Sequence, residues 1–272
     1  MAKFVFLDVD GTLVDFKGEM PESAEYALKE AQKNGHKMIL CTGRYYGQIY
    51  PWLLERVNFD GIVSSSGACI RYNGEVIFTK YFTTEQLLKL HSVCEEAGAA
   101  LLYQVDDGLI IENEEKYKRI RQGYKDIGMT DFIVNEMMQK LSFADVASIK
   151  TCEKCNYCGS KIKADEMLKM LGDEFNIDPI SIGQGQDAYG EVNRSDINKG
   201  IAIHKLVAAA GGDITDTIAI GDAGNDFNMI KMAHIGVAMG NATDRIKEVA
   251  DMITDDVDKD GIYTAFGRLG LI

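Results

Sequence analysis

The stretch "FLDVDGTL", residues 6–13, places two aspartates directly behind an apolar run. The run "KFVFLDV" predicts a buried strand, and Asp8 and Asp10 lie two positions apart at its end. Residues two apart on an extended strand face the same side, so both carboxylates can point at one place. Two like charges there are costly unless a cation lies between them. The rest of the chain therefore has to supply a cation site at this strand end.

The first third of the chain alternates apolar strands with amphipathic helices. Strands are expected at 3–9, 37–43 and 61–67, with helices at 20–36 and 46–59. This βαβαβ order is typical of a parallel sheet with helices on both faces. The same rhythm returns after Asn198, with a helix at 199–211, a strand at 216–222, a helix at 225–233 and a strand at 234–240.

The middle of the chain has a different pattern. A helix at 83–98, capped by Thr83 or Thr84, precedes two strands within 99–113 that are joined through Asp107–Gly108 as a hairpin. Further strands are expected near 146–154, 178–183 and 187–193, and a helix at 161–175. Hairpins mixed with helices indicate a separate α+β unit. We therefore expect an α/β core formed by 1–82 and 191–272, with a cap domain inserted at 83–190.

Composition and charge exclude several kinds of partner and location for this protein. The 272 residues carry 29 basic and 42 acidic side chains, a net charge of -13, which disfavours nucleic acid and anionic membranes as partners. No apolar run approaches the roughly 18 residues of a membrane span, and no export signal is recognisable. The expected location is the cytoplasm, with the six cysteines reduced. The sequence carries no signal for an oligomeric state.

Three further stretches end strands or begin helices with polar groups. "CTGR" offers the Thr42 hydroxyl and the Gly43 N–H. "NKG" places Lys199 in the first turn of a helix, where a cation opposes the helix dipole. "IAIGDAGND" ends a strand with the polar side chains Asp222, Asn225 and Asp226.

In open α/β sheets, ligands bind beyond the carboxyl ends of the strands. Asp8, Asp10, Asp222 and Asp226 would form an oxygen-rich site there, which suits a hard cation such as Mg²⁺. Thr42, Gly43 and Lys199 then suit the oxygens of a phosphoryl group, and a carboxylate can serve as a covalent nucleophile.

The four stretches "DVDGT", "TGR", "NKG" and "GDAGND", in this order, resemble the motifs of the haloacid dehalogenase-like phosphohydrolases. The insertion between the second and third motifs, and "GVAMGNA" at 236–242, resemble the Cof-type subfamily with its large α/β cap. One departure is "SSSGA" at 64–68, where many relatives have asparagine before the Gly-Ala, here Ser66. The resemblance implies a Rossmann-like core and a Mg²⁺-dependent phosphatase acting on a small phosphorylated metabolite, such as a sugar phosphate.

The resemblance also implies a role for each motif residue. Asp8 would attack phosphorus and form an aspartyl-phosphate, while Asp10 would protonate the leaving oxygen and then activate water. Thr42 and Lys199 would hold phosphoryl oxygens. The remaining roles are metal binding by Asp222, phosphate orientation by Asn225, and support of the metal or of Lys199 by Asp226.

Two other functions stay open at this stage. A sugar phosphomutase would use the same aspartyl-phosphate and return the phosphoryl group to the substrate. A metal- or redox-responsive binding protein could be built on "CEKCNYC", which holds Cys152, Cys155 and Cys158, although a zinc or iron–sulfur site usually needs a fourth ligand.

Overall fold

The computed structural model describes residues 2–106, 108–179 and 187–272, and the chain divides into two compact units. The first unit comprises Met1–Gly43, Ile49–Thr79 and Asn198–Ile272, and the second comprises Arg44–Gln48 and Lys80–Ile197. The second unit is thus longer at both ends than the range 83–190 expected from the sequence. Part of the reason is that strand β11 (Tyr189–Arg194) belongs to the sheet of the second unit.

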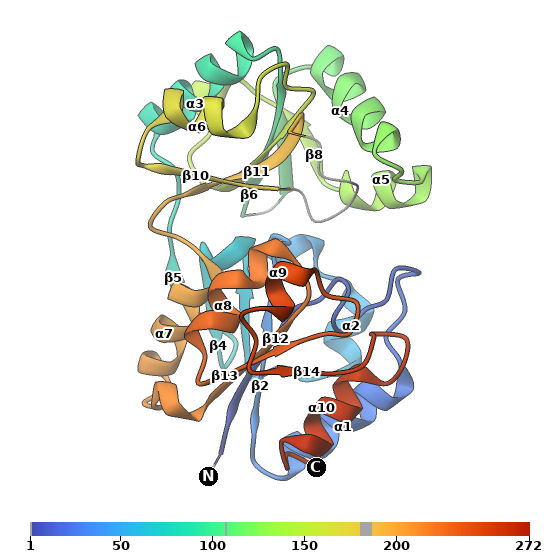
Figure 1. Cartoon of the computed structure of the whole chain (residues 1–272). Helices are drawn as coiled ribbons and strands as arrows, with labels where there is room; N and C mark the ends of the chain where they lie inside the picture. The colour runs from blue at the N-terminus through green and yellow to red at the C-terminus, as the bar shows by residue number, and fades with distance from the viewer. Residues whose placement is uncertain (1, 107, 180–186) are drawn as a thin grey trace. The chain divides into compact units, whose positions relative to one another are not determined.

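The first unit is built on an eight-stranded sheet in the order β14-β13-β12-β1-β2-β3-β4-β5 (Figure 1). All pairs from β14 to β3 are parallel, whereas β4 and β5 are antiparallel additions at one edge. The strands are β1 (Phe4–Leu7), β2 (Lys37–Cys41), β3 (Gly61–Ser64), β4 (Cys69–Tyr72), β5 (Glu75–Thr79), β12 (Thr217–Gly221), β13 (Ile235–Ala238) and β14 (Met252–Ile253).

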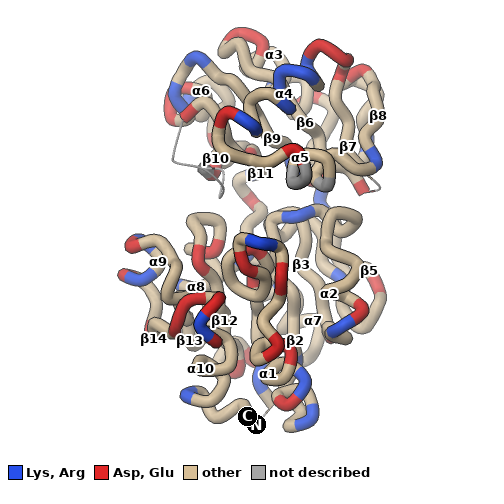
Figure 2. Tube along the Cα trace, turned by 90° about the vertical axis from the view of Figure 1, so that its right-hand side faces the viewer, with Lys and Arg blue, Asp and Glu red and all other residues tan. Residues whose placement is uncertain are grey.

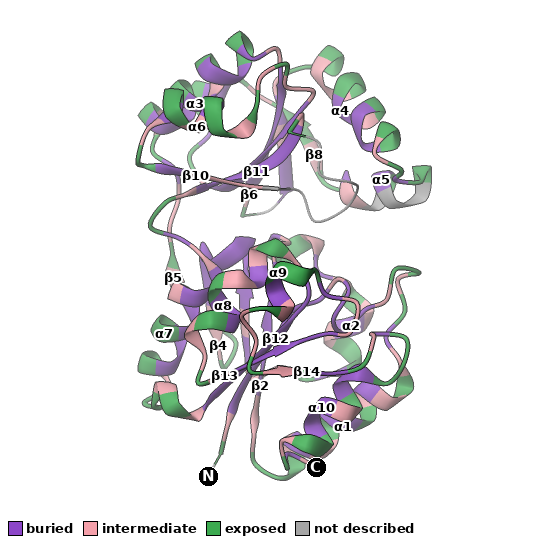
Figure 3. Cartoon of the chain, in the orientation of Figure 1, coloured by how far each residue is buried: buried purple, intermediate pink, exposed green. Residues whose placement is uncertain are grey.

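Helices cover both faces of this sheet, as Figure 1 shows: α1 packs with α10, and α7 packs with α8 on the other side. The central strands are mostly apolar and buried (Figure 3), as expected for a parallel sheet with helices on both faces. The predicted α/β class with a parallel core sheet is confirmed. The helices are α1 (Glu22–Lys33), α2 (Pro51–Arg56), α7 (Lys199–Ala209), α8 (Phe227–Met232), α9 (Asp244–Lys247) and α10 (Gly261–Arg268), with 3₁₀ turns at Ser65–Gly67, Ile214–Asp216 and Gly224–Asp226.

The second unit has a six-stranded sheet in the order β10-β11-β9-β6-β7-β8. Its strands are mostly antiparallel, as the hairpin pattern predicts, and only β7 and β8 run parallel. The strands are β6 (Ala100–Val105), β7 (Gly108–Ile111), β8 (Leu141–Phe143), β9 (Cys152–Cys158), β10 (Phe175–Pro179) and β11. The helices are α3 (Thr84–Glu96), α4 (Glu114–Asp126), α5 (Asp131–Met137) and α6 (Ala164–Leu171), with 3₁₀ turns at Tyr46–Gln48 and Val146–Ser148.

Most predicted elements of this unit are present. Thr83 caps α3 through a capping box with Gln86, so the first of the two proposed caps is the one used. The strand expected near 146–154 begins only at Cys152, because 146–148 forms a 3₁₀ turn capped by Asp145. Asp107 of the predicted hairpin turn and 180–183 of a predicted strand lie outside the described residues.

Candidate active site

Three neighbouring strands of the first unit carry the predicted polar residues just past their ends. Asp8 follows β1, Thr42 follows β2 and Asp222 follows β12, and these strands lie in the order β12-β1-β2. The strands are parallel, so their carboxyl ends lie at the same edge of the sheet. The sequence therefore brings residues more than 200 positions apart to one edge, which is where ligands bind in such folds.

Lys199 places a positive charge at this edge of the sheet. It is the first residue of α7, whose N-cap Asn198 accepts a hydrogen bond from the backbone N–H of Ile201. The Lys199 side chain is fully buried, and its Nζ lies 2.6 Å from an oxygen of Asp8 and 2.6 Å from an oxygen of Asp226. Burial alone would lower the pKa of Lys199, but the two carboxylates outweigh it and raise that pKa.

Asp226 is held on both sides. One oxygen binds Lys199, and the other accepts hydrogen bonds from the backbone N–H groups of Asp222 and Ala223, each at 3.0 Å. A Cβ on Gly221 would lie 2.6 Å from the Asp226 carboxyl, so only glycine lets the strand end approach this closely. These contacts fix Asp226 as the partner that orients Lys199.

Asp222 turns toward Asp8 and is oriented by Thr12. The Thr12 hydroxyl, fully buried, donates to one oxygen of Asp222 at 3.0 Å. Ligand atoms of Asp8, Asp222 and Asp226 all lie within 4.8 Å of one another, and all three residues are buried. Three of the four carboxylates named from the sequence thus lie together, and Asp10 is not in the group.

The charge of this cluster is not balanced by the side chains in it. Burial and the repulsion of Asp226 raise the pKa of Asp8 to about 7, although Lys199 opposes the rise. Burial, Asp226 and Asp8 raise the pKa of Asp222 to about 8. Three buried carboxylates with one ammonium therefore favour a further cation, and an all-oxygen donor set fits Mg²⁺.

Two further residues, Gly11 and Asn241, hold the turn after β1. Gly11 has a φ of +83°, and a Cβ there would lie 2.3 Å from an oxygen of Asp222. The Gly11 carbonyl accepts a hydrogen bond from the Asn241 side chain at 2.8 Å, and the same side chain accepts from the Val257 N–H. Asn241 lies in "GVAMGNA", a stretch that the sequence connects only with a subfamily resemblance.

The remaining predicted residues lie in the segments that follow β1, β2 and β12, at the same edge of the sheet. Asp10 lies in the turn and adds to the negative charge around Asp8. Thr42 is buried, and its carbonyl accepts from the N–H of Ser66 at 3.0 Å; Gly43 follows it. Asn225 lies in the 3₁₀ turn before α8, and within the described chain its buried side-chain oxygen has no hydrogen-bond partner.

"CEKCNYC" forms strand β9 of the second unit, which is buried along its whole length. Cys152 and Cys155 lie in one apolar core with their sulfurs 3.5 Å apart, whereas Cys158 lies in another. Among the described residues, none of these cysteines lies within 4.8 Å of two other candidate metal ligands. The run is therefore a core strand, and its spacing does not reflect a shared metal site.

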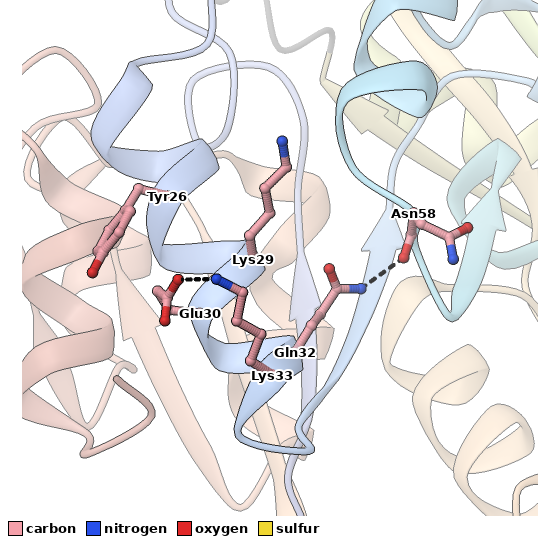
Figure 4. Close-up of a pocket in the computed structure, with 6 residues that line it drawn as sticks. All are labelled: Tyr26, Lys29, Glu30, Gln32, Lys33 and Asn58. Carbon is pink, nitrogen blue, oxygen red and sulfur yellow. Dashed lines mark hydrogen bonds and ion pairs between the residues drawn. The ribbon is translucent and has the colours of Figure 1, made fainter.

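Two surface features lie outside the carboxylate cluster. An open depression of about 660 Å³ runs along α1, lined by Tyr26, Lys29, Glu30, Gln32, Lys33 and Asn58 (Figure 4). None of the predicted site residues lines it, and the Glu30–Lys33 ion pair and the Gln32–Asn58 hydrogen bond span parts of it. In the second unit, His91, Glu95 and Glu112 lie close together, but the Lys116 ammonium already binds both glutamates.

A sequence profile of haloacid dehalogenase-like hydrolases matches residues 5–266. The chain belongs to this family. It is thus an enzyme of the hydrolase class, and its four motif stretches are those whose residues meet at the edge of the core sheet. No helix within the described residues has both the length and the apolar character needed to cross a bilayer. Acidic and basic residues are interspersed along the chain in both units (Figure 2).

Curated relatives and solved structures of this family cover the whole chain. The 5-amino-6-(5-phospho-D-ribitylamino)uracil phosphatase YcsE of Bacillus subtilis is 27% identical over 269 residues, covering 97% of this chain and 94% of the relative. The phosphoglycolate phosphatase of Methanobrevibacter smithii is 27% identical over 267 residues, covering 98% of each. The structure of the subclass IIB sugar phosphatase BT4131 is 27% identical, with a TM-score of 0.83 and full coverage of both chains. These relatives are phosphatases.

Proposed function

We propose that the protein is a Mg²⁺-dependent phosphatase that hydrolyses a small phosphorylated metabolite, such as a sugar phosphate, through an aspartyl-phosphate. The observation that carries this proposal is the buried Lys199 ammonium, 2.6 Å from both Asp8 and Asp226, beside the Asp222 carboxylate. A lysine in this position lowers the repulsion between an anionic nucleophile and an anionic substrate. The hydrolase family and the phosphatase relatives support the same reaction class.

Asp8 is the proposed nucleophile because it is the more rigidly placed of the two aspartates. It directly follows β1, and its backbone N–H donates to the Ile220 carbonyl at 3.1 Å. Asp10 lies in the turn and is partly exposed, which suits a group that exchanges protons with substrate and water.

The proposed reaction has two steps at Asp8. A carboxylate oxygen of Asp8 forms a bond to phosphorus, and the leaving oxygen takes a proton from Asp10. Asp10 then accepts a proton from the water that attacks the aspartyl-phosphate, which releases inorganic phosphate and restores Asp8. Thr42, Gly43, Lys199 and Asn225 are the proposed donors to the phosphoryl oxygens.

Asp8, Asp10 and Asp222 are the residues proposed to hold Mg²⁺, with Asp226 contributing to the site and orienting Lys199. Bound Mg²⁺ would neutralise charge on the phosphoryl group as an electrophile. The fit rests on the three buried carboxylates with a single ammonium between them.

The second unit, which contains the inserted domain expected at 83–190, is the proposed selector of the metabolite. Relatives of this chain are named for a ribitylaminouracil phosphate, for phosphoglycolate and for sugar phosphates, so similarity alone leaves the metabolite undecided among small phosphate esters. All six cysteines are free, which supports a reducing compartment and hence the cytoplasm.

The proposal is tested by screening phosphate monoesters, sugar phosphates first, with detection of released phosphate. We expect hydrolysis that needs Mg²⁺, is lost in excess EDTA and falls at least about 10⁴-fold in Asp8→Asn, as for removal of a covalent nucleophile. Asp15→Asn, a change at a partly exposed residue after the same strand, is the matched control and should keep activity. Wild-type turnover by Asp8→Asn would refute the mechanism, and an isomerised sugar phosphate without free phosphate would indicate a mutase.

A further inference from the structure

The turn after β3, Ser65–Gly67, has an unusual backbone. Its three residues have φ of +49°, +56° and +108°, so Ser65 and Ser66 lie in the left-handed region that serine rarely adopts. The hydroxyl groups of Ser64 and Ser66 are also buried, and neither has a hydrogen-bond partner among the described residues. A strained backbone and unpaired buried polar atoms lower stability, and they are concentrated at functional sites. The turn therefore calls for a functional explanation.

One side of this turn holds the backbone of Thr42. β3 lies beside β2 and runs parallel to it, so the turn follows the strand next to the end of β2. The Thr42 N–H donates to the Val63 carbonyl at 2.8 Å, and the Thr42 carbonyl accepts from the Ser66 N–H at 3.0 Å. Both backbone polar groups of this proposed phosphate-binding residue are thus fixed by β3 and the turn.

The other side of the turn packs on the start of α7. A Cβ on Gly67 would lie 2.7 Å from the Asn198 carbonyl oxygen and 3.3 Å from the Ala202 Cβ. The same carbonyl accepts the first hydrogen bond of α7, from the Ala202 N–H at 3.1 Å, and Lys199 is the first residue of the helix. Only glycine allows so close an approach at a positive φ. Gly67 therefore fixes how near the start of α7 lies to the end of β3.

The spacing of Thr42 and Lys199 matters if both bind one phosphoryl group, because a misplacement of about 1 Å can cost about 100-fold in rate. Thr42 follows β2 and Lys199 begins α7, and the whole second unit lies between them in the sequence. The Lys199 ammonium is bound by Asp8 and Asp226, but the position of its backbone depends on where α7 begins. Since the turn contacts both elements, its conformation determines the spacing.

We propose that the Ser65–Gly67 turn is a positioning element of the active site that sets the place of Lys199 relative to Thr42. It holds Thr42 through the backbone of Ser66 and the start of α7 through Gly67, and all of these residues belong to the first unit. The inference rests on the proposed function in one respect, since it takes Thr42 and Lys199 as donors to the same phosphoryl group. The backbone conformation carries this role, and the Ser66 hydroxyl has no part in it.

Gly67→Ala tests the contact with α7. The new Cβ would collide with the Asn198 carbonyl, so α7 has to shift and Lys199 with it. With p-nitrophenyl phosphate and Mg²⁺, we expect kcat/KM to fall by about 100-fold and the inhibition constant of inorganic phosphate to rise by about tenfold. Gly74→Ala is the matched control: Gly74 has a φ of +83°, but a Cβ there has nothing within 4 Å. It should lose stability and keep both kinetic constants, which is also what a merely structural role of Gly67 would give.

Ser66→Thr and Ser66→Gly test the backbone conformation itself. Threonine keeps the hydroxyl but is β-branched and resists a φ of +56°, whereas glycine lacks the hydroxyl and adopts this φ freely. Both variants keep the N–H that binds Thr42. We expect Ser66→Thr to lose about tenfold in kcat/KM and Ser66→Gly to keep the wild-type value. The reverse order would assign the role to the hydroxyl and overturn the inference.

Thermal unfolding identifies any variant that fails to fold, and the other pair then carries the test. Wild-type kcat/KM and phosphate inhibition in folded Gly67→Ala would overturn the inference, whereas a wild type that hydrolyses no phosphate ester would contradict the proposed function alone. In that case crystal structures of the wild type and of the folded variant decide. A shift of Lys199 relative to Thr42 by about 1 Å or more would support the positioning role, and unchanged positions would overturn it.

Discussion

Single residues decide the geometry of the carboxylate cluster. Two of them are glycines, whose missing side chain leaves room for a carboxyl group. Gly11 and Gly221 let the strand ends pass close to Asp222 and Asp226, where a Cβ would collide with a carboxyl group. Thr12 then orients Asp222, and Lys199 bridges Asp8 and Asp226. The positions of the ionisable groups thus depend on their uncharged neighbours.

Gly11→Ala should impair both stability and catalysis. The new Cβ would lie 2.3 Å from the Asp222 carboxyl at a φ of +83°, so Asp222 has to move. We expect a loss of about 1–3 kcal/mol of stability and about 100-fold in kcat/KM. Gly18→Ala is the matched control, because Gly18 has a φ of +85° but a Cβ there would have nothing within 4 Å; it should show the backbone cost alone. Equal activity of the two variants would contradict this account.

The metal-free protein should lose stability as the pH rises from about 4 to about 8. Burial raises the pKa of Asp8 to about 7 and that of Asp222 to about 8, so the folded state binds more protons than the unfolded state in this range. Stability is therefore highest below the unfolded pKa of an aspartate and falls as these groups ionise. Urea unfolding in EDTA at several pH values measures the slope. Asp222→Asn should flatten it, and a stability that increases toward pH 8 would contradict the prediction.

The sequence indicates which charged side chains lie near this edge of the sheet, but it does not indicate the contacts that orient them. Carboxylates and a lysine at strand and helix ends are visible as local patterns. The hydrogen bond from Thr12 to Asp222 joins residues 210 positions apart, and that from Asn241 to Gly11 joins residues 230 apart. No local pattern specifies either, because both depend on the packing of distant loops.

At the scale of elements, the alternation of strands and helices was predictable. The residues at turns could have predicted one further hairpin. The β4–β5 hairpin was not predicted, although Asn73 and Gly74 at its turn have φ of +50° and +83° and form a recognised hairpin signal. Strand β9 was hard to recognise as a core strand from its composition, because cysteines at regular gaps suggest a metal site. A register irregularity near its start places Cys152 and Cys155 on one side of the strand.

The cysteines should behave as core residues. All six are free and buried, and burial raises the pKa of Cys94 and of Cys158 to about 12. Since the thiolate is the reactive form, we expect almost no reaction of the native protein with a thiol reagent such as Ellman's reagent within minutes, and six reactive thiols in guanidinium. Zinc retained by purified protein at one equivalent, and released with the reaction of three thiols, would contradict the assignment of β9 as a core strand.

At the scale of the whole molecule, the two units differ in how many of the predicted site residues they carry. Every predicted catalytic, phosphate-binding and metal-binding residue lies in the first unit, whereas the second has its own sheet and two apolar cores of its own. A single insertion at 83–190, as expected from the sequence, gives two crossings between the units, one at each end. The structure has two more, because Arg44–Gln48, directly after the predicted phosphate-binding Gly43, belongs to the second unit and buries Tyr45 in its core.

Replacing residues 80–197 by a short flexible linker should therefore separate chemistry from selection. Tyr45→Ser is added to this variant, since the apolar ring would lose its surroundings in the second unit. We expect the remaining unit to hydrolyse p-nitrophenyl phosphate with Mg²⁺. The ratio of kcat/KM between the best and the poorer metabolite phosphates should fall by about tenfold or more relative to the full chain, because the contacts proposed to select the substrate are gone. Circular dichroism and thermal unfolding establish that it is folded, and the same variant with Asp8→Asn shows that any turnover arises from the carboxylate cluster. Unchanged selectivity of the folded variant would move the specificity determinants into the first unit, to residues beside Asp8 and Lys199.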